Sequence, residues 1–521
     1  MDTRIQLNDL YLGKIDAKNE LLEESPDEIS NFISSFIIPP NIIPKQFQEK
    51  KKYFISGLKG TGKTALLRYL ALNAEKSGIT TKFILFKSSF DDEQKQEFAR
   101  ASSNIIADSN TNKIKDKYQD FEMIWRWFLY RNIVDISNNK NITIFQENTI
   151  WESFKAIVSA PNYINEKTGI KSIIPTLKHG EIEISKNPKL TLNLSWDKDN
   201  KSKIKFTSLV RKADELFSSL DKAQDSLYIY LDELELSYDT SKKYKRDIFL
   251  IRDLVVTIEK LNAIAKKKNF NLCLFAAIRL EVINAIESSG KEINKPMSDF
   301  GTQIIWNQKG INEKEQPLLK IITEKIKQSE KNLNLEKTTD RNEIWEKYFP
   351  KHINRYSPQE HILHHSWYRP RDIVRLLNIA KDQYPYEHKF THKIFDAISK
   401  TYSTESWKEI TEELKTKYKN EEIDAIKRIF YGYKKQYFSF KELEEHCNET
   451  KDLYQNLNDL LEKYKLSNIL FDLYKIGVIG NAKKEGQRTY FRYSFRGDDE
   501  ILFEQNIILH RALKAFMSAQ N

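Results

Sequence analysis

Four short runs of apolar residues along the first 310 positions predict the strands of a buried parallel sheet. These runs cover residues 53–55, 83–86, 227–231 and 272–278. Strands that are apolar on both faces are typical of the interior of a parallel sheet. Residues 65–74 and 247–266 lie between the runs and have the composition or spacing of helices, so strands and helices alternate. The pattern predicts an α/β fold in which a parallel sheet has helices on both faces.

The remaining stretches predict an extension, an insertion and two further regions. Apolar residues at helical spacing between Ile29 and Phe36 predict a helix that ends before Pro39. Residues 178–206 alternate polar and apolar side chains, which predicts an inserted β-hairpin or small sheet. The predicted regions are an N-terminal helical extension at 1–40, an α/β domain at 41–309 with an insertion at about 95–210, a helical lid at 310–405 and a winged-helix-like C-terminal domain at 406–521.

The C-terminal region combines a helix with a basic two-stranded segment. Residues 466–476 have helical spacing, and two short strands are expected around 483–487. Over residues 488–496, apolar side chains alternate with basic and polar ones, so one face is apolar and the other basic. A helix followed by such a hairpin predicts a winged helix. We expect its basic ribbon to consist of Lys483, Lys484, Arg488, Arg492 and Arg496, with Phe491, Tyr493 and Phe495 packed beneath.

This basic ribbon leaves two kinds of partner open. Its positive charges are suited to the phosphates of a nucleic acid. The polar face of the preceding helix, however, carries Ser467, Asn468, Asp472 and Lys475, whereas a helix that reads bases usually offers Arg, Asn or Gln. The ribbon can therefore also contact a protein. The net charge of +10, from 84 basic and 74 acidic residues, permits nucleic-acid binding without demanding it.

The composition excludes several classes of protein. The two cysteines, Cys273 and Cys447, are too far apart to form a metal-ligand motif, which argues against a disulfide scaffold or a structural zinc site. No apolar run approaches the roughly 18 residues of a membrane span, and the N-terminus has no signal sequence. We expect a cytoplasmic protein with no membrane partner. His361, His364 and His365 lie close together but lack the accompanying ligands of a metal site, so we expect them to pack or to face solvent.

Residues 57–64 carry the strongest chemical signal in the chain. Their sequence, Gly-Leu-Lys-Gly-Thr-Gly-Lys-Thr, fits G-x-x-x-x-G-K-[ST] at every fixed position and lies between an apolar strand and a helix. In such a loop, glycines let backbone N–H groups converge on phosphate oxygens, while Lys63 reaches the β- and γ-phosphates and the Thr64 hydroxyl binds Mg²⁺. The predicted nucleotide-binding residues are Gly57, Leu58, Lys59, Gly60, Thr61, Gly62, Lys63, Thr64 and Ala65.

The strand at 227–231 ends in two adjacent carboxylates. A P-loop protein needs a second strand that delivers an acid to the metal ion. Asp232 is therefore predicted to hold Mg²⁺, and Glu233 to act as the general base toward the attacking water. The guanine-reading motif Asn-Lys-x-Asp is absent. We therefore expect an ATPase, with ATP and Mg²⁺ as its ligands, rather than a GTPase.

Two arginines further along the chain are candidates to sense the nucleotide. Arg279 ends the strand at 272–278, where its charge would face the γ-phosphate from the side opposite Lys63 and stabilise the transition state. The alternative for Arg279 is an ion pair with a surface acid such as Glu281. Pro370 is suited to the first position of a helix, which would place Arg371 in its first turn.

This order of parts resembles the AAA+ and STAND-type ATPases, in the branch of the origin-recognition loaders. There a strand-tip sensor residue precedes a helical lid with an arginine at a helix start, so the resemblance implies that Arg279 is the first sensor and Arg371 the second. The chain also resembles a bacterial P-loop ATPase family whose members begin with Phe-Ile-x-Pro-Pro, as at 36–40. Several bacterial defence ATPases share this architecture. The long insertion departs from the loaders, and Arg246 and Arg252 are either arginine fingers or helix-surface residues.

Three functions remain open from the sequence. The first is an ATP-hydrolysing switch or motor in bacterial stress or phage defence, which we expect to be a homo-oligomer with a protein partner. The second is a DNA-associated loader or remodeller. The third is a nucleotide-gated scaffold with negligible turnover, and the presence of both Asp232 and Glu233 argues against it.

Overall fold

The chain folds into two compact units. The computed structural model describes residues 5–21, 25–89, 95, 121–159, 163–164, 171–172, 181–183, 203–236, 240–290, 292–335, 340–415, 417–486, 488–498 and 500–518. The sheet unit comprises Ile43–Lys59 and Leu66–Ile304. The helical unit comprises Met1–Ile42, Gly60–Ala65 and Ile305–Asn521. Among the described helices, none is long and apolar enough to cross a lipid bilayer.

The sheet unit is built on five parallel strands, as the apolar runs predicted. The strand order is β2-β7-β8-β1-β9, and every neighbouring pair is parallel. The strands are β1 (Phe54–Gly57), β2 (Thr80–Leu85), β7 (Leu227–Leu234), β8 (Leu272–Arg279) and β9 (Gly301–Gln303). The three central strands are buried along nearly their whole length, which explains why they are apolar except near their carboxyl ends. The prediction of an α/β fold with a parallel sheet is confirmed.

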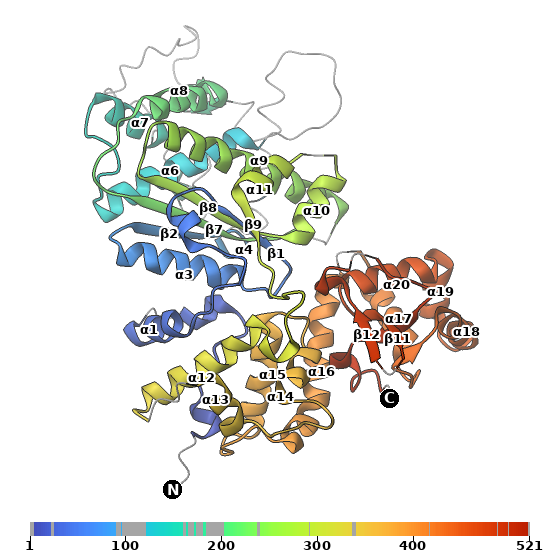
Figure 1. Cartoon of the computed structure of the whole chain (residues 1–521). Helices are drawn as coiled ribbons and strands as arrows, with labels where there is room; N and C mark the ends of the chain where they lie inside the picture. Colours follow the sequence, from blue (N-terminus) through green and yellow to red (C-terminus); the bar gives the residue numbers. More distant parts are fainter. Residues whose placement is uncertain are drawn as a thin grey trace. The chain divides into compact units, whose positions relative to one another are not determined.

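Helices cover both faces of this sheet. Figure 1 shows α3 (Lys63–Lys76) on one face, and α6 (Glu122–Lys140) and α9 (Ser241–Lys267) on the other. The indole N–H of Trp125 donates to the Leu250 carbonyl at 2.8 Å and joins α6 to α9. Further helices of the unit are α2 (Pro44–Gln48), α4 (Phe86–Ser89), α7 (Thr149–Ser159), α8 (Phe206–Ser219), α10 (Leu280–Ser288) and α11 (Asn294–Phe300).

Among the residues of the insertion that the structure describes, there are two short antiparallel strand pairs. β3 (Tyr163–Ile164) pairs with β4 (Lys171–Ser172), and β5 (Glu181–Glu183) pairs with β6 (Lys203–Lys205). The second pair lies within residues 178–206, the stretch for which the sequence predicted an inserted hairpin or small sheet. Its alternating residues at 191–196 lie outside the described residues.

The middle of the helical unit consists of five α-helices, in agreement with the helical pattern over residues 310–400. These helices are α12 (Lys320–Asn332), α13 (Arg341–Tyr348), α14 (Pro358–His364), α15 (Pro370–Gln383) and α16 (His392–Leu414). Helix α15 begins at Pro370, as predicted, because the fixed φ of proline suits the first helical position and its missing N–H costs nothing there.

The N-terminal segment lies along α15. Its α-helix, α1 (Pro26–Ser35), begins after a Ser25 cap, while described residues 5–21 contain only the 3-10 turns η1 (Leu7–Asp9) and η2 (Ala17–Leu21). Three backbone carbonyls of this segment accept hydrogen bonds from side chains spaced along α15. The pairs are Ile15 with Arg371, Gly13 with Asn378 and Leu10 with Lys381, at 3.3, 3.0 and 2.7 Å.

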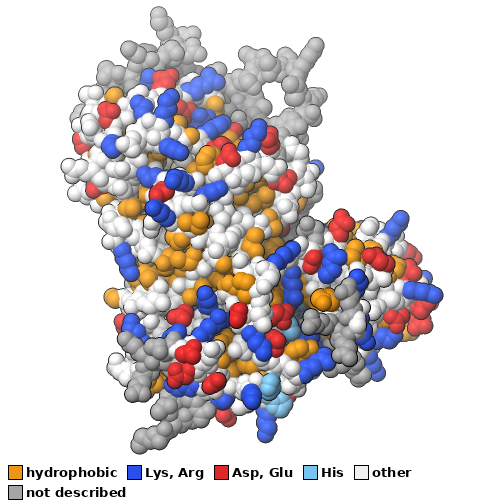
Figure 2. Space-filling model, viewed as in Figure 1, with side chains coloured by type: hydrophobic (Ala, Val, Ile, Leu, Met, Phe, Trp, Pro, Cys, Tyr) orange, Lys and Arg blue, Asp and Glu red, His pale blue; other side chains and the backbone are white. Residues whose placement is uncertain are grey.

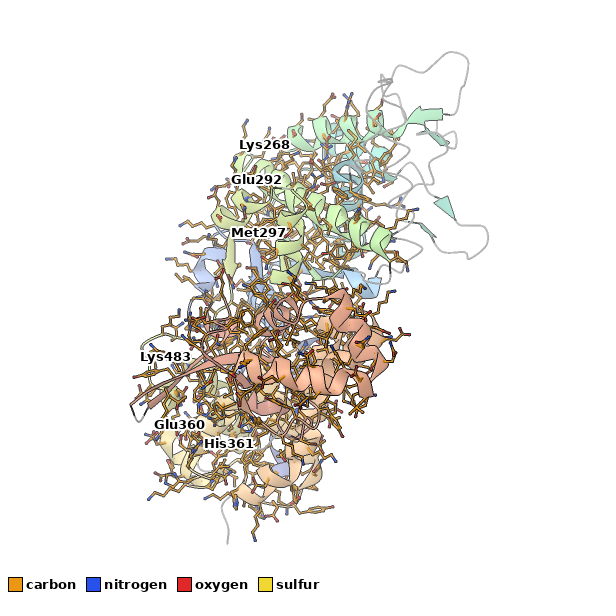
Figure 3. All side chains as sticks on the ribbon, turned by 90° about the vertical axis from the view of Figure 1, so that its right-hand side faces the viewer. Lys268, Glu292, Met297, Glu360, His361 and Lys483 are labelled. Carbon is orange, nitrogen blue, oxygen red and sulfur yellow. The ribbon has the colours of Figure 1, made fainter. Side chains whose placement is uncertain are left out.

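The C-terminal part of the helical unit surrounds a small antiparallel sheet. Its helices are α17 (Asn420–Phe430), α18 (Phe440–Thr450), α19 (Gln455–Lys463) and α20 (Leu466–Lys475). Its strands, in the order β10-β13-β11-β12, are β10 (Tyr437–Phe438), β13 (Asn506–Leu509), β11 (Ile479–Glu485) and β12 (Arg488–Arg492). The predicted helix followed by two strands is therefore present, as α20 and the β11–β12 hairpin. Figure 3 labels Lys483 on this hairpin.

Candidate nucleotide-binding site

The sheet order creates a point where ligands commonly bind. Strands β1 and β8 are neighbours, and Gly57 at the end of β1 is in register with Arg279 at the end of β8. From β1 the chain continues to β2 on one side of the pair, whereas from β8 it continues to β9 on the other side. In open parallel sheets, ligands bind at the carboxyl ends of two strands whose connections diverge in this way. The residues that follow β1 are those of the predicted phosphate loop.

Two of the three glycines of this loop have conformations that other residues rarely adopt. Gly60 has φ of +81° and Gly62 has φ of +94°, and α3 begins directly afterwards at Lys63. A Cβ atom on Gly60 would also lie 3.2 Å from Cβ of Arg371. A left-handed backbone just before a helix turns successive N–H groups toward one side, which is the geometry of an anion-binding nest.

Residues of the helical unit hold the second half of the loop, Gly60–Ala65, which belongs to the same unit. The indole N–H of Trp306 donates to the Thr61 carbonyl at 2.9 Å. The backbone N–H of Arg371, in the first turn of α15, donates to the Gly60 carbonyl at 3.4 Å. No pattern in the sequence indicated Trp306, because its partner is a backbone atom 245 positions away.

The Arg371 side chain is held by an acidic partner in this structure. Its guanidinium donates to Glu409 of α16 at 2.8 Å and to the Ile15 carbonyl at 3.3 Å. Arg375, one turn further along α15, also pairs with Glu409. The contact between Arg371 and a nucleotide therefore stays a prediction. A phosphate that binds the Arg371 guanidinium would have to replace the Glu409 carboxylate.

The two predicted catalytic carboxylates lie at an irregularity of β7. The register between β7 and β8 shifts between Leu231 and Leu234. Glu233 has φ of +59°, and its N–H donates to Oδ1 of the buried Asp232 at 2.8 Å. A left-handed non-glycine residue costs about 1–3 kcal/mol and tends to occur where a side chain must be aimed for function. The irregular strand end is thus a feature to be expected of a catalytic pair.

The other arginines predicted to act on the nucleotide have acidic partners. Arg279 pairs with Glu235 and, at 3.6 Å, with Glu281, the acid expected as its alternative partner. Arg246 and Arg252 lie on α9, where each pairs with the aspartate that follows it in the sequence. Their roles at the nucleotide stay predictions.

The predicted basic ribbon is wrong in two positions. Strand β12 ends at Arg492, and Arg496 lies in a 3-10 turn, η6 (Ser494–Arg496), where it faces Glu313 at 3.4 Å and the Tyr368 ring at 4.8 Å. Lys484 is in register with Thr489 and lies on the opposite face of β11 from Lys483. The alternation in the sequence does not reveal where the strand stops. The apolar side was predicted correctly, because Phe491, Tyr493 and Phe495 pack with Ala482 and Ile508.

The histidines before α15 are packing residues. His361, which Figure 3 labels on α14, packs against His365 with ring centroids 4.2 Å apart and the ring planes tilted by 31°. Burial lowers the pKa of His361 to about 2 and that of His365 to about 4, so both are neutral near pH 7. His364 contacts Glu313 at 2.9 Å. Burial tends to raise the pKa of Glu313, but His364 and Arg496 lower it to about 2.

Comparison with known protein families finds a match for one region of the chain. Residues 316–411 match the family model of a FunZ-associated C-terminal helical domain. The matched region runs from η4 (Pro317–Leu319) through most of α16 and includes both Arg371 and Glu409. It is less than half of the chain, so the match describes these helices and not the whole protein. No curated protein matches the chain.

Proposed function

We propose that the protein is an ATP-binding, Mg²⁺-dependent ATPase that acts as a conformational switch or motor. The observation that carries this proposal is the position of the complete phosphate-loop sequence. It follows β1 at the edge where the strand connections diverge, has left-handed glycines and leads directly into α3. Strand β7 of the same sheet carries Asp232 and Glu233 near its carboxyl end.

The residues present fit a magnesium ion and a triphosphate. Mg²⁺ prefers hard oxygen ligands, and the Thr64 hydroxyl and the Asp232 carboxylate supply them. When bound, the ion neutralises charge that develops on the phosphates. Lys63 and the backbone N–H groups of the loop orient the phosphates, while Glu233 accepts the proton of the water that attacks the γ-phosphate. The bond between the β–γ bridging oxygen and the γ-phosphorus then breaks, which releases ADP and phosphate.

The helical unit supplies the conformational response in this proposal. Because Arg371 contacts Gly60 through its backbone and Glu409 through its side chain, a movement of the loop is transmitted directly to α15 and α16. Such coupling supports the AAA+ and STAND-type assignment, with Arg371 as the second sensor and Arg279 as the first. The resemblance of the sequence to bacterial defence ATPases favours a role in stress or phage defence, while the match of residues 316–411 concerns the helical domain alone.

The C-terminal sheet is better suited to a protein partner than to DNA. We propose that α20 and the β11–β12 hairpin form a winged helix, in which Lys483, Tyr490 and Arg492 share one face. Arg496 is engaged by Glu313, so the face has fewer cations than the sequence suggested. On the side drawn in Figure 2, Lys and Arg of the C-terminal region are interspersed with Asp and Glu. Salt-sensitive gel shifts with random-sequence DNA would instead favour the loader.

A single substitution tests the enzymatic proposal. Glu233→Gln should retain ATP binding but lose at least about 10²-fold in turnover, because an amide cannot accept the proton. Phosphate release and ATP affinity are measured in parallel, and Glu215→Gln, which changes an exposed acid of the sheet unit, serves as the comparison. Wild-type turnover in Glu233→Gln would show that Glu233 only shapes the strand end.

A further inference from the structure

We propose that Trp306 is a positioning residue of the phosphate loop, an inference that rests on the proposed function. Trp306 follows the last strand of the sheet, has only 4% of its surface exposed and donates its indole N–H to the Thr61 carbonyl at 2.9 Å. Thr61 itself is 6% exposed. A buried indole N–H needs a partner, and here the partner is an atom of the loop backbone.

A fixed carbonyl determines where the N–H group of the same peptide points. The peptide unit is planar and trans, so its C=O and N–H are directed oppositely. Holding the Thr61 carbonyl toward Trp306 therefore turns the Gly62 N–H away from Trp306. The Arg371 N–H acts in the same way on the Gly60 carbonyl and thus orients the N–H of Thr61.

The two contacts together hold two consecutive peptide planes of the loop. The positive φ values of Gly60 and Gly62 allow this arrangement, in which the orientation of successive N–H groups is fixed as in a phosphate-binding nest. Without the Trp306 bond, a buried carbonyl loses its partner and the peptide between Thr61 and Gly62 can rotate. The loop then has to be reordered when the nucleotide binds, and this cost weakens affinity.

Trp306→Phe separates the hydrogen bond from the packing, because it removes the N–H and keeps an aromatic ring. We expect KM for ATP to rise roughly ten-fold, as one unmade buried hydrogen bond implies, while kcat stays within about two-fold. A purely structural role would instead reduce the fraction of active protein, which lowers kcat and leaves KM unchanged.

Two buried tryptophans provide matched controls. Trp125→Phe removes an indole–carbonyl hydrogen bond of 2.8 Å in the sheet unit. It therefore shows how the loss of such a bond away from the phosphate loop affects KM. Trp345→Phe changes a tryptophan of the helical unit that is also 4% exposed and whose indole N–H makes no hydrogen bond with the described residues. Neither control should raise KM.

A second variant covers the case in which Trp306→Phe fails to fold. Replacement of Trp306 by 3-benzothienylalanine exchanges the N–H for sulfur in a ring of the same shape and should raise KM similarly. Lys63→Ala distinguishes a failure of the proposed ATPase function from a failure of the proposed role of Trp306. If Lys63→Ala binds ATP like the wild type, the proposed function fails. If Lys63→Ala abolishes binding but both Trp306 variants keep a wild-type KM, the role of Trp306 is overturned.

Discussion

The two units of the protein carry their chemistry in different ways. In the sheet unit the catalytic candidates, Asp232 and Glu233, lie within β7, a strand that is buried along nearly its whole length. In the helical unit, buried charges and histidines meet, as where Arg371 and Arg375 share Glu409. The second half of the phosphate loop, Gly60–Ala65, belongs to this helical unit. Nucleotide binding should therefore depend on contacts within the helical unit, such as those of Trp306 and Arg371 with the loop backbone.

The largest expected effect comes from removing the main cation of the loop. Lys63→Ala should reduce ATP binding below detection, because the phosphates lose their principal side-chain counterion. Calorimetric titration with ATP and Mg²⁺ measures the affinity. Lys76→Ala, at the exposed end of the same helix, should bind ATP normally. Equal affinity in Lys63→Ala and the wild type would disprove the assignment of the loop.

A smaller effect is expected from the acid that holds Arg371. Glu409→Gln weakens the ion pairs with Arg371 and Arg375, so it should lower the melting temperature of the helical unit. The same change should raise ATP affinity roughly three- to ten-fold, because Arg371 no longer has to leave a carboxylate to reach a phosphate. Glu405→Gln, an exposed position of the same helix, is the control for both measurements.

If Arg371→Ala removes the gain in affinity from Glu409→Gln, the two residues act on the nucleotide together. Unchanged or weaker ATP binding in Glu409→Gln, with Glu405→Gln at the wild-type level, would contradict the idea that Glu409 restrains Arg371. In that case the helical unit supports the loop through Trp306 and the backbone of Arg371 only.

The last effect concerns the pH dependence of stability rather than ATP binding, and it should also distinguish the two units. The folded pKa values of about 2 for His361 and about 4 for His365 lie below the unfolded value near 6.5. The unfolded chain therefore binds more protons below about pH 6.5, and stability falls as the pH drops from there toward 4. Each group contributes up to about 1.4 kcal/mol per pH unit in this window.

Hydrogen exchange in denaturant at pH 7.5 and pH 5 measures this loss for each unit separately. The helical unit should lose more stability than the sheet unit, whose sequence contains a single histidine, His179. His361→Phe should reduce the pH dependence, whereas His392→Phe, with its side chain 49% exposed, should not. Equal losses in both units would indicate that the buried histidines do not determine acid stability.

The sequence predicted the sheet unit better than the helical unit for physical reasons. Buried parallel strands must be apolar on both faces, so their positions are visible as runs, whereas β9 (Gly301–Gln303) contains no apolar run and was missed. Arg496 was wrongly predicted to belong to the basic ribbon, because apolar and polar residues continue to alternate in the sequence after the strand has ended. The left-handed conformation of Glu233 and the bond from Trp306 depend on tertiary contacts, which leave no local pattern.

Release of phosphate from ATP by the purified full-length chain, measured with and without Mg²⁺, tests the central claim most directly. The account predicts steady release with Mg²⁺ and release at least about 10²-fold slower once the metal is chelated, because Mg²⁺ has to neutralise charge on the phosphates. Failure to bind or hydrolyse ATP with Mg²⁺ present, in a preparation that is folded by circular dichroism, would contradict it.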